Sequence, residues 1–245
     1  MGAAHAWSRS RPSWEVAAAT FLFVGVVTLN ALAWAMPAMW MTVVVYHLVF
    51  AVGLCVVVPT WLWLRRGRSL AEMGLSLDRW PWCVGVGLAL AVLTVTPRLG
   101  NVAMPSVGGL ATLVPAMCMS TMFEEVFFRG YLQTTVRRGF GVLPALGCSA
   151  VAFSIYHVGY GPEWREPSML VQMTLVGLMF AVAYQLTASV LTSFTLNLPH
   201  AIVTFLERGE YFTIEAALAS LLALAVGSGW LAYAGRPQRT PHAES

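Results

Sequence analysis

The chain has 245 residues, of which 58% are hydrophobic and 10% are charged, and its mean hydropathy is +0.70. A water-soluble domain carries about 25% charged residues, so this composition excludes a soluble globular protein and predicts an integral membrane protein embedded in a lipid bilayer. The net charge of +3 is small, and all 14 basic residues are arginine. Since no arginine-rich face alternates with aromatic side chains, nucleic acid is not an expected partner.

Eight apolar segments predict an all-α fold, a polytopic transmembrane helix bundle of about eight spans. They run over 15–36, 40–64, 80–97, 108–136, 142–158, 168–186, 189–206 and 212–234. Each is long enough, or nearly long enough, for about 20 helical residues to cross about 30 Å of hydrocarbon. We expect residues 15–235 to form a single membrane-embedded domain, between a cytoplasmic segment over 1–14 and a disordered cytoplasmic tail over 236–245.

Arginines gather at alternate ends of these segments. One end carries Arg9, Arg11, Arg65, Arg66, Arg68, Arg79, Arg137, Arg138, Arg236 and Arg239, and the other carries Arg98, Arg165 and Arg208. Because cytoplasmic loops are enriched in basic residues, both termini are predicted to be cytoplasmic. The first segment, with its preceding arginines and its Ala33-Trp34-Ala35, could instead be a secretory signal, but its apolar run exceeds the usual length of about 7–15 residues.

The fourth segment contains two adjacent carboxylates and an arginine, Glu124, Glu125 and Arg129. Ionisable groups at bilayer depth cost about 2.5 kcal/mol each or more, and they mark functional positions. Glu125 and Arg129 are four residues apart and share a helical face, whereas Glu124 points about 100° away. Glu125 and Arg129 can therefore neutralise each other and leave Glu124 as a general base. The alternative is a purely structural salt-bridge network, as in many transporters.

Two histidines on other segments extend this pattern. His157 closes the run Phe153-Ser154-Ile155-Tyr156-His157 in the fifth segment, and His200 lies in the seventh. A carboxylate and two imidazoles can activate a water molecule and stabilise an oxyanion, which peptide-bond hydrolysis requires. His47, alone in the second segment, is interpreted as a hydrogen-bonded core residue.

The same carboxylate and histidines could coordinate zinc, because two histidines and one carboxylate make an open catalytic site. No HExxH or other compact ligand motif accompanies them. The cysteines lie singly in apolar segments without CxxC spacing, and we expect them to be small buried packing residues. They are Cys55, Cys83, Cys118 and Cys148.

Three motifs follow one another along the chain: Glu124-Glu125-x3-Arg129, Phe153-x3-His157, and His200. In order and spacing they resemble the motifs of the CaaX-protease and bacteriocin-processing (CPBP) intramembrane endopeptidases. That family includes type II CaaX prenyl proteases, lysostaphin-resistance-A-like and Abi proteins, and myxosortase-like enzymes. The resemblance covers about residues 108–206 and implies an eight-helix membrane bundle, with a protease domain over 15–235.

The resemblance also implies roles for individual residues. Glu124 would be the water-activating general base, and Glu125 and Arg129 would orient and polarise the site. His157 would assist the water and protonate the leaving amine, while His200 would help to bind the oxyanion. This glutamic mechanism requires no cofactor.

One position departs from the family pattern. The third motif usually has Asn or Asp four residues after its histidine, but here that residue is Thr204. Threonine offers one O–H donor and lacks a planar amide. Asn197, three residues before His200, could supply the missing donor.

The predicted function is that of a glutamic intramembrane endopeptidase. It would hydrolyse a peptide bond in or near the embedded segment of a membrane-anchored or membrane-spanning protein, as in C-terminal tail or leader processing. The arginine- and alanine-rich usage indicates a GC-rich bacterial genome, and hence the bacterial cytoplasmic membrane. The alternatives are a zinc-dependent metalloprotease, a proton- or ion-coupled transporter, and an inactive regulatory protein. A transporter should show paired halves, and the chain holds no second copy of the acidic motif.

Overall fold

The computed structural model describes residues 13–36, 43–102, 105–208 and 212–236. Within these ranges every regular element is a helix. The elements are α1 (Ser13–Ala35), η1 (Val43–Val57), α3 (Val58–Leu64), η2 (Leu70–Met73), α4 (Trp80–Val95), η3 (Thr96–Asn101), α5 (Val107–Glu125), η4 (Val126–Gln133), α6 (Thr134–Phe140), α7 (Val142–His157), η5 (Pro162–Arg165), α8 (Pro167–Thr187), α9 (Val190–Arg208) and α10 (Ile214–Ala234). The predicted all-α class is confirmed for the described residues.

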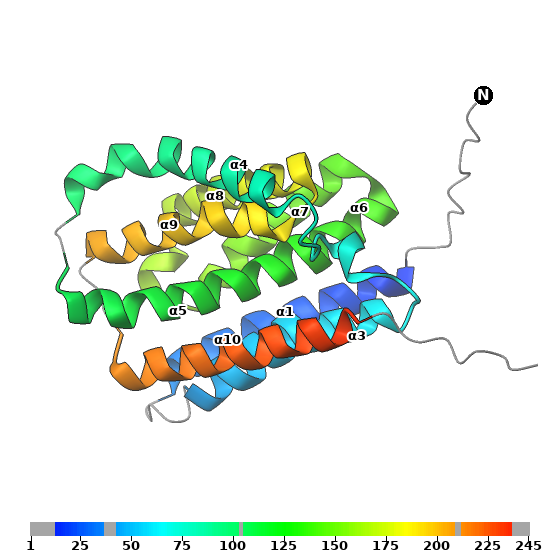
Figure 1. Cartoon of the computed structure of the whole chain (residues 1–245), viewed down its shortest axis with the longest axis horizontal. Coiled ribbons are helices and arrows are strands. Elements are labelled where there is room, and N and C mark those ends of the chain that lie inside the picture. Colours follow the sequence, from blue (N-terminus) through cyan, green and yellow to red (C-terminus); the bar gives the residue numbers. More distant parts are fainter. Residues whose placement is uncertain (1–12, 37–42, 103–104, 209–211, 237–245) are drawn as a thin grey trace, which may run out of the picture.

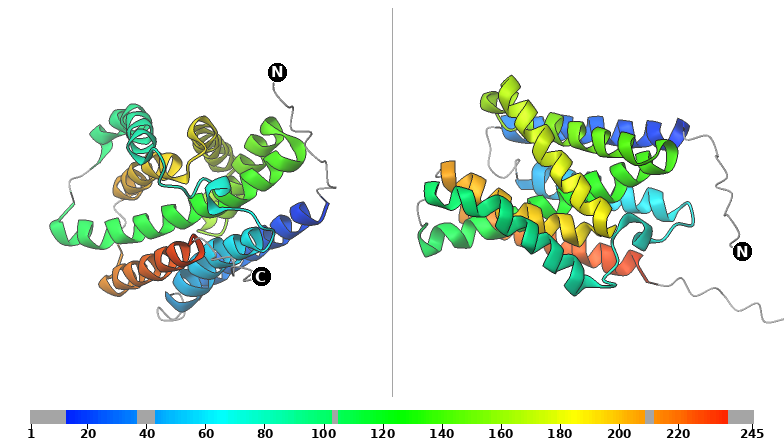
Figure 2. Two further views of the ribbon diagram at one scale, coloured as in Figure 1. Left: turned by 45° about the vertical axis from the view of Figure 1, so that its right-hand side comes forward. Right: turned by 90° about the horizontal axis from the view of Figure 1, so that it is seen from above.

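Each of the eight predicted segments is mostly helical over its described residues, and the helices form one bundle. The first turn of α1 and the last turn of α10 lie at the same end of it (Figure 1). The helices pack mainly as α4 on α9, α7 on α8, and α10 on both α5 and η1. The view from above in Figure 2 shows the same bundle with its long helices crossing at moderate angles. The sidedness of the bundle relative to the cytoplasm stays a prediction.

Six helices of the described chain are long and apolar enough to cross a membrane, so this is a multi-pass membrane protein. They cover Trp14–Ala33, Val44–Leu64, Trp80–Asn101, Val107–Phe140, Pro167–Thr187 and Ile214–Ala234. The other two helices differ: α7 has only 16 residues, and α9 carries polar residues such as Asn197 and His200. The count of eight spans therefore stays a prediction.

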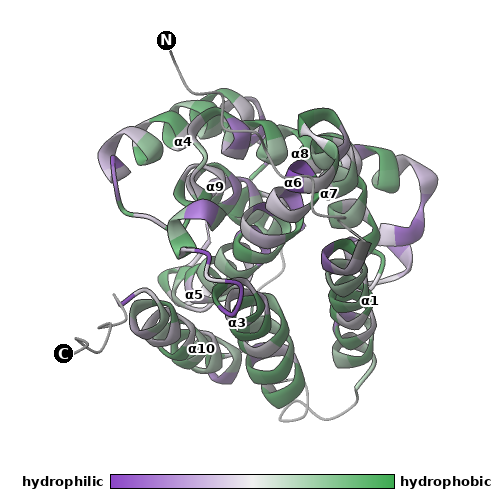
Figure 3. Ribbon diagram, turned by 90° about the vertical axis from the view of Figure 1, so that its right-hand side faces the viewer, coloured by the Kyte–Doolittle hydropathy of each residue, from purple (hydrophilic) through white to green (hydrophobic). Residues whose placement is uncertain are grey.

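The outer surface of the bundle is apolar. Phe21 is 80% exposed and Leu93 is 71% exposed, as expected for side chains that face lipid. Hydrophobic colour runs along most of the helices in Figure 3, and several connections are hydrophilic. Cys55 and Cys83 are buried as predicted, but Cys118 is only half-buried and Cys148 is exposed. The prediction for Cys148 was wrong because both the interior and the lipid-facing surface of a membrane bundle are apolar, so hydrophobicity alone does not tell them apart.

Small residues let neighbouring helices approach closely. A Cβ atom on Gly87 of α4 would overlap Thr195 of α9, and one on Gly177 of α8 would lie 3.0 Å from the Ala150 carbonyl oxygen of α7. Small residues at such contacts are typical of helix association in membranes. The predicted tail over 236–245 and the segment 1–14 lie mostly outside the described residues.

Candidate active site

The helix that carries the glutamates changes its geometry directly after them. α5 ends at Glu125 and continues as the wider π-helical stretch η4. Such stretches occur frequently at functional sites. A Cβ atom on Gly130 of η4 would lie 3.1 Å from the Met73 carbonyl oxygen and 3.4 Å from Val190 Cγ2. Glycine at this position therefore lets η2 pack closely against the acidic segment.

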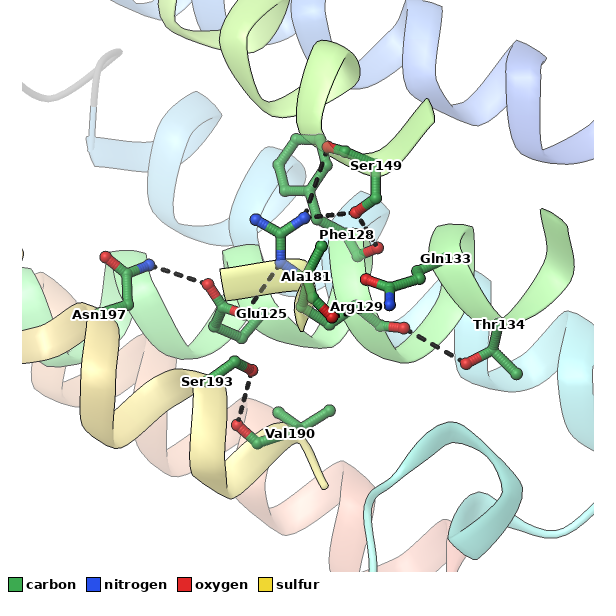
Figure 4. A network of polar contacts seen from close by, with 10 residues as sticks. All are labelled: Glu125, Phe128, Arg129, Gln133, Thr134, Ser149, Ala181, Val190, Ser193 and Asn197. Carbon is green, nitrogen blue, oxygen red and sulfur yellow. Dashed lines mark hydrogen bonds and ion pairs between the residues drawn. The ribbon is translucent and has the colours of Figure 1, made fainter. Parts of the chain in front are cut away.

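Glu125 and Arg129 form the ion pair that their spacing predicts. Arg129 Nε lies 3.4 Å from Glu125 Oε2, and both side chains are completely buried. Arg129 Nη1 donates to Ser149 Oγ, and Ser149 Oγ donates to the Phe128 carbonyl oxygen at 3.1 Å (Figure 4). The pair thus ties η4 to α7 inside the bundle.

Asn197 completes this buried network from α9. Its Nδ2 donates to Glu125 Oε1 at 2.9 Å (Figure 4). One amide proton of Asn197 is therefore used to hold Glu125, a role different from the oxyanion donor considered above. Two further hydrogen bonds stabilise η4 and the start of α6. Gln133 Nε2 donates to the Ala181 carbonyl oxygen at 3.0 Å, and Thr134 Oγ1 donates to the Arg129 carbonyl oxygen at 3.3 Å.

Glu124 points away from this pair and into a cavity. Its Oε1 accepts hydrogen bonds from Ser120 Oγ at 2.9 Å and from the Tyr160 hydroxyl at 3.3 Å. Both of these bonds end on the same oxygen, Oε1. The expected division of labour between the two glutamates therefore has a geometric basis: Glu125 is paired, and Glu124 is held by neutral donors.

Two more tyrosines extend the donors around Glu124. The Tyr46 hydroxyl lies 3.3 Å from Ser120 Oγ, and the Tyr156 hydroxyl lies 2.6 Å from that of Tyr160. Since an ionised carboxylate only accepts, each hydroxyl in these chains donates toward Glu124. Burial, together with the nearby Tyr46 and Glu124, raises the pKa of the Tyr160 phenol well above its usual range, so Tyr160 keeps its proton at neutral pH.

His157 lies at the end of α7 in a fixed orientation. Its Nδ1 donates to the Phe153 carbonyl oxygen at 2.7 Å. In the neutral ring Nε2 then carries the lone pair and can accept a proton. The ring lies between aromatic neighbours, with centroids 4.4 Å from Phe153 and 5.4 Å from Trp164. The tautomer and the ring position are therefore both constrained.

His200 is held from outside the cavity by an arginine. Arg98 Nη1 lies 3.3 Å from Nδ1 and 3.4 Å from Nε2 of His200, so the guanidinium covers the imidazole instead of pairing with one nitrogen. Arg98 Nη2 also donates to Thr204 Oγ1 at 3.0 Å, and Arg98 forms an ion pair with Glu207. His200, Thr204 and Glu207 share one face of α9 because they are four and three residues apart.

The single proton of the Thr204 hydroxyl is already donated in a hydrogen bond within α9. Oγ1 donates to the His200 carbonyl oxygen at 2.8 Å while it accepts from Arg98. A hydroxyl has only one proton to donate. In this conformation Thr204 therefore positions Arg98 and His200, and it offers no donor to the cavity.

One cavity of about 440 Å³ brings the predicted residues together. Glu124 from α5, His157 from α7, and His200 from α9 all line it, as do Asn197 and Thr204. Glu125 and Arg129 lie behind it in the buried network. His47 also reaches the cavity, and its Nε2 lies 3.1 Å from Ser220 Oγ. The prediction that His47 is a hydrogen-bonded core residue is thus confirmed.

The described part of the chain contains no cluster of side chains that would form a metal site. Across 13–36, 43–102, 105–208 and 212–236, no group of three or more His, Cys, Asp or Glu side chains is arranged to hold a metal ion. The zinc alternative rests on residue types alone, and chelation tests it below.

Some residues of the site were missed by the sequence analysis. Ser120 precedes Glu124 by four residues within α5, so helical spacing was a usable signal for it. Tyr160 lies in the turn after α7 and meets Glu124 from 36 residues away, so spacing gave no signal for it. Arg98 had no such signal, because it meets His200 from 102 residues away.

Comparison with known proteins agrees with this geometry. Residues 106–206 match the family model described as Rce1-like, Type II CAAX prenyl endopeptidase Rce1-like. This segment, which is less than half of the chain, is thus similar to a membrane endopeptidase family, in agreement with the resemblance to the CPBP proteins. The matched segment contains Glu124, His157 and His200. No curated protein and no solved structure matches the chain.

Proposed function

We propose that this protein is a glutamic intramembrane endopeptidase of the bacterial cytoplasmic membrane. The observation that carries the proposal is the shared cavity: a carboxylate held by neutral donors and two imidazoles, from three different helices, face one space of about 440 Å³. Irregular peptide backbone is tolerated at membrane depth where it lines or occupies a water-filled cavity. A scissile peptide bond and a water molecule can therefore meet there.

Glu124 is the proposed general base. Ser120 and Tyr160 hold Oε1, so Oε2 accepts a proton from the attacking water while the water oxygen bonds to the scissile carbonyl carbon. A positioned base of this kind contributes about 10²–10⁴-fold to the rate. The buried Glu125–Arg129 pair fixes the backbone that presents Glu124.

His157 is the proposed partner of the water and of the leaving group. Its Nδ1 proton is donated to the Phe153 carbonyl oxygen, so Nε2 can accept a hydrogen bond from the water. After attack, the proton that Glu124 took from the water passes by way of His157 Nε2 to the amine nitrogen as the carbon–nitrogen bond breaks. The products are then a carboxylate and a free amine.

His200 is the proposed donor to the oxyanion. Removing one oxyanion donor from other proteases costs about 10²–10³-fold in rate. Thr204 and Arg98 hold the His200 backbone and ring and do not supply this donor themselves. The substrate class that fits is a membrane-anchored or membrane-spanning protein whose cleavage site enters the cavity from the bilayer.

The test is cleavage of quenched-fluorescence peptides by the purified protein in vesicles. One peptide carries a prenylated C-terminus and another a single transmembrane helix with a flexible tail. We expect cleavage of at least one, loss of cleavage with Glu124→Gln and with His157→Ala, and unchanged cleavage in the presence of a chelator. The matched control is Glu163→Gln, which changes an exposed carboxylate on η5 outside the cavity lining.

Other outcomes identify the alternatives. Cleavage that a chelator removes and zinc restores would make the protein a metalloprotease. No cleavage of either peptide, together with proton flux into vesicles that Glu124→Gln stops, would make it a transporter. A protein that neither cleaves nor conducts, but retains a membrane partner, would be the regulatory member that Thr204 suggested.

A further inference from the structure

A second polar cluster lies at the opposite end of the bundle from Arg98. It consists of Glu15 at the start of α1, Arg66 and Arg68 after α3, and Tyr131 of η4, and we call it the basic cluster. Arg66 Nη1 lies 2.9 Å from Glu15 Oε1, and Arg68 Nη2 lies 2.6 Å from the same oxygen. Two cations thus share one carboxylate, which leaves a formal excess of one positive charge.

Four polar atoms of the basic cluster are buried without a hydrogen-bond partner among the described residues. They are Arg66 Nε, Arg66 Nη2, Arg68 Nη1 and Tyr131 Oη. Tyr131 is only 1% exposed. A buried donor without a partner costs about 1–3 kcal/mol, and more when it is charged. The excess of donors and of positive charge calls for an anionic acceptor.

The residues that carry these four atoms lie close together. Tyr131 interacts electrostatically with Arg66, Glu15 and Arg68. The Arg68 guanidinium lies 4.7 Å from the ring centre of Trp63, and that ring lies 6.4 Å from Tyr131. The side chains of Arg66 and Arg68 remain 14% and 17% exposed, so the cluster lies at the edge of the bundle, with the four donor atoms just inside it.

An apolar groove begins one helical turn along α1 from Glu15. It has a volume of about 410 Å³ and runs between α1, the η4–α6 helix and α7. Its lining includes Ala19, which is four residues after Glu15, and Leu132, which is next to Tyr131. The residues that line the groove therefore adjoin two members of the basic cluster along the chain, and the groove continues along the lipid-facing side of the bundle.

We propose that the basic cluster and this groove form a binding site for one anionic phospholipid. The phosphate would accept hydrogen bonds from the unpartnered guanidinium and phenol groups, since arginine suits phosphate geometry. An acyl chain would occupy the groove. Basic pockets between membrane helices bind anionic head groups elsewhere, and here the charge excess, the orphaned donors and the adjoining apolar groove specify the same ligand.

The site explains features that the proposed peptidase chemistry does not use. The basic cluster lies at the end of the bundle where α1 begins and α3 ends, whereas Glu124 lies within the membrane-spanning helix. Lipid binding is therefore expected whether or not the protein cleaves peptides.

The test measures lipid binding by the delipidated full chain in detergent. The probes are phosphatidylglycerol, phosphatidylcholine with the same acyl chains, and inorganic phosphate, and native mass spectrometry and the unfolding midpoint are the readouts. We expect phosphatidylglycerol to bind and stabilise the protein, with little effect of the other two. Arg66→Gln with Arg68→Gln should weaken its binding about 30-fold.

Matched variants separate the head-group contacts from general charge. Arg65→Gln removes a charge from the same loop, where Arg65 lies over the Trp61 ring, and should change binding much less. Tyr131→Phe removes only an unpartnered hydroxyl, so it should weaken lipid binding without lowering the stability of the lipid-free protein.

A second pair of variants tests the groove. Gly147 lines it, and a Cβ atom there would meet nothing within 4 Å, so Gly147→Leu adds a side chain at the groove without a backbone clash at Cβ. We expect it to weaken phosphatidylglycerol binding. Gly85→Leu, at an equally open position of α4 outside the groove, is the control.

Three results would overturn the proposal. Phosphatidylglycerol binding unchanged by the double arginine variant would exclude the basic cluster. Equal binding of phosphatidylcholine would exclude recognition of an anion. Inorganic phosphate as effective as the lipid, with Gly147→Leu silent, would make the ligand a soluble anion instead.

Discussion

The same Glu→Gln substitution can be compared at two adjacent glutamates that lie in different environments. Glu124→Gln and Glu125→Gln remove the same charge from neighbouring residues. Glu125 is completely buried against Arg129, whereas Glu124 has only neutral donors on Oε1 and faces the cavity. We therefore expect Glu125→Gln to lower stability and Glu124→Gln to lower activity.

The expected loss for Glu125→Gln follows from the burial of Arg129. Removing one partner of a buried ion pair costs about 3–5 kcal/mol, because the other charge is left uncompensated. Glutamine keeps a hydrogen-bond acceptor, and the Arg129 guanidinium remains 5.2 Å from the Phe153 ring centre. The low end, about 3 kcal/mol or roughly 10²-fold in the unfolding equilibrium, is therefore expected.

For Glu124→Gln we expect an unfolding free energy equal to or slightly above that of the wild type, because a nearly buried charge without a cationic partner is removed. Peptide cleavage should fall about 10²–10⁴-fold. Unfolding in mixed micelles with increasing sodium dodecyl sulfate measures the first quantity, and the quenched peptides measure the second. Per folded molecule, Glu125→Gln should lose far less activity than Glu124→Gln.

A double variant provides the internal control. When Glu125→Gln is combined with Arg129→Met, the uncompensated cation disappears, and much of the lost stability should return. Equal destabilisation by the two single variants, or no recovery in the double variant, would refute the division between a structural and a catalytic glutamate.

Three further predictions follow from individual contacts. Tyr160→Phe removes one of the two donors to Glu124 Oε1 and should slow cleavage about tenfold or more without unfolding the protein; an unchanged rate contradicts this role. Arg98→Gln releases His200 and Thr204 and should slow cleavage about 10–100-fold, whereas the control Arg138→Gln, whose partner Glu72 lies on η2, should not. Gly87→Leu should destabilise the protein by at least about 1–3 kcal/mol through overlap between α4 and α9, while Gly85→Leu should be neutral in the same unfolding assay.

The helices were largely predictable because the bilayer imposes a length and an apolar composition on each crossing segment. The fourth segment, predicted over 108–136, continues in the structure as one helical run to Phe140. The Glu125–Arg129 pair was predictable for a similar reason, since it lies within one helix. The burial of individual side chains was harder to predict, as Cys148 shows, because apolar residues occur both in the core and on the lipid-facing surface.

The sequence alone determined the class of protein, the positions of its apolar helices and the three motifs, because each of these depends on local composition or on spacing along one helix. Only the tertiary structure decided that Glu124, His157 and His200 share a cavity, that Tyr160 and Ser120 hold one carboxylate oxygen, and that Arg98 covers His200. These contacts depend on how whole helices pack and cross. Packing in a membrane is set by shape and by a few polar contacts between distant segments, and periodicity within one segment does not encode it.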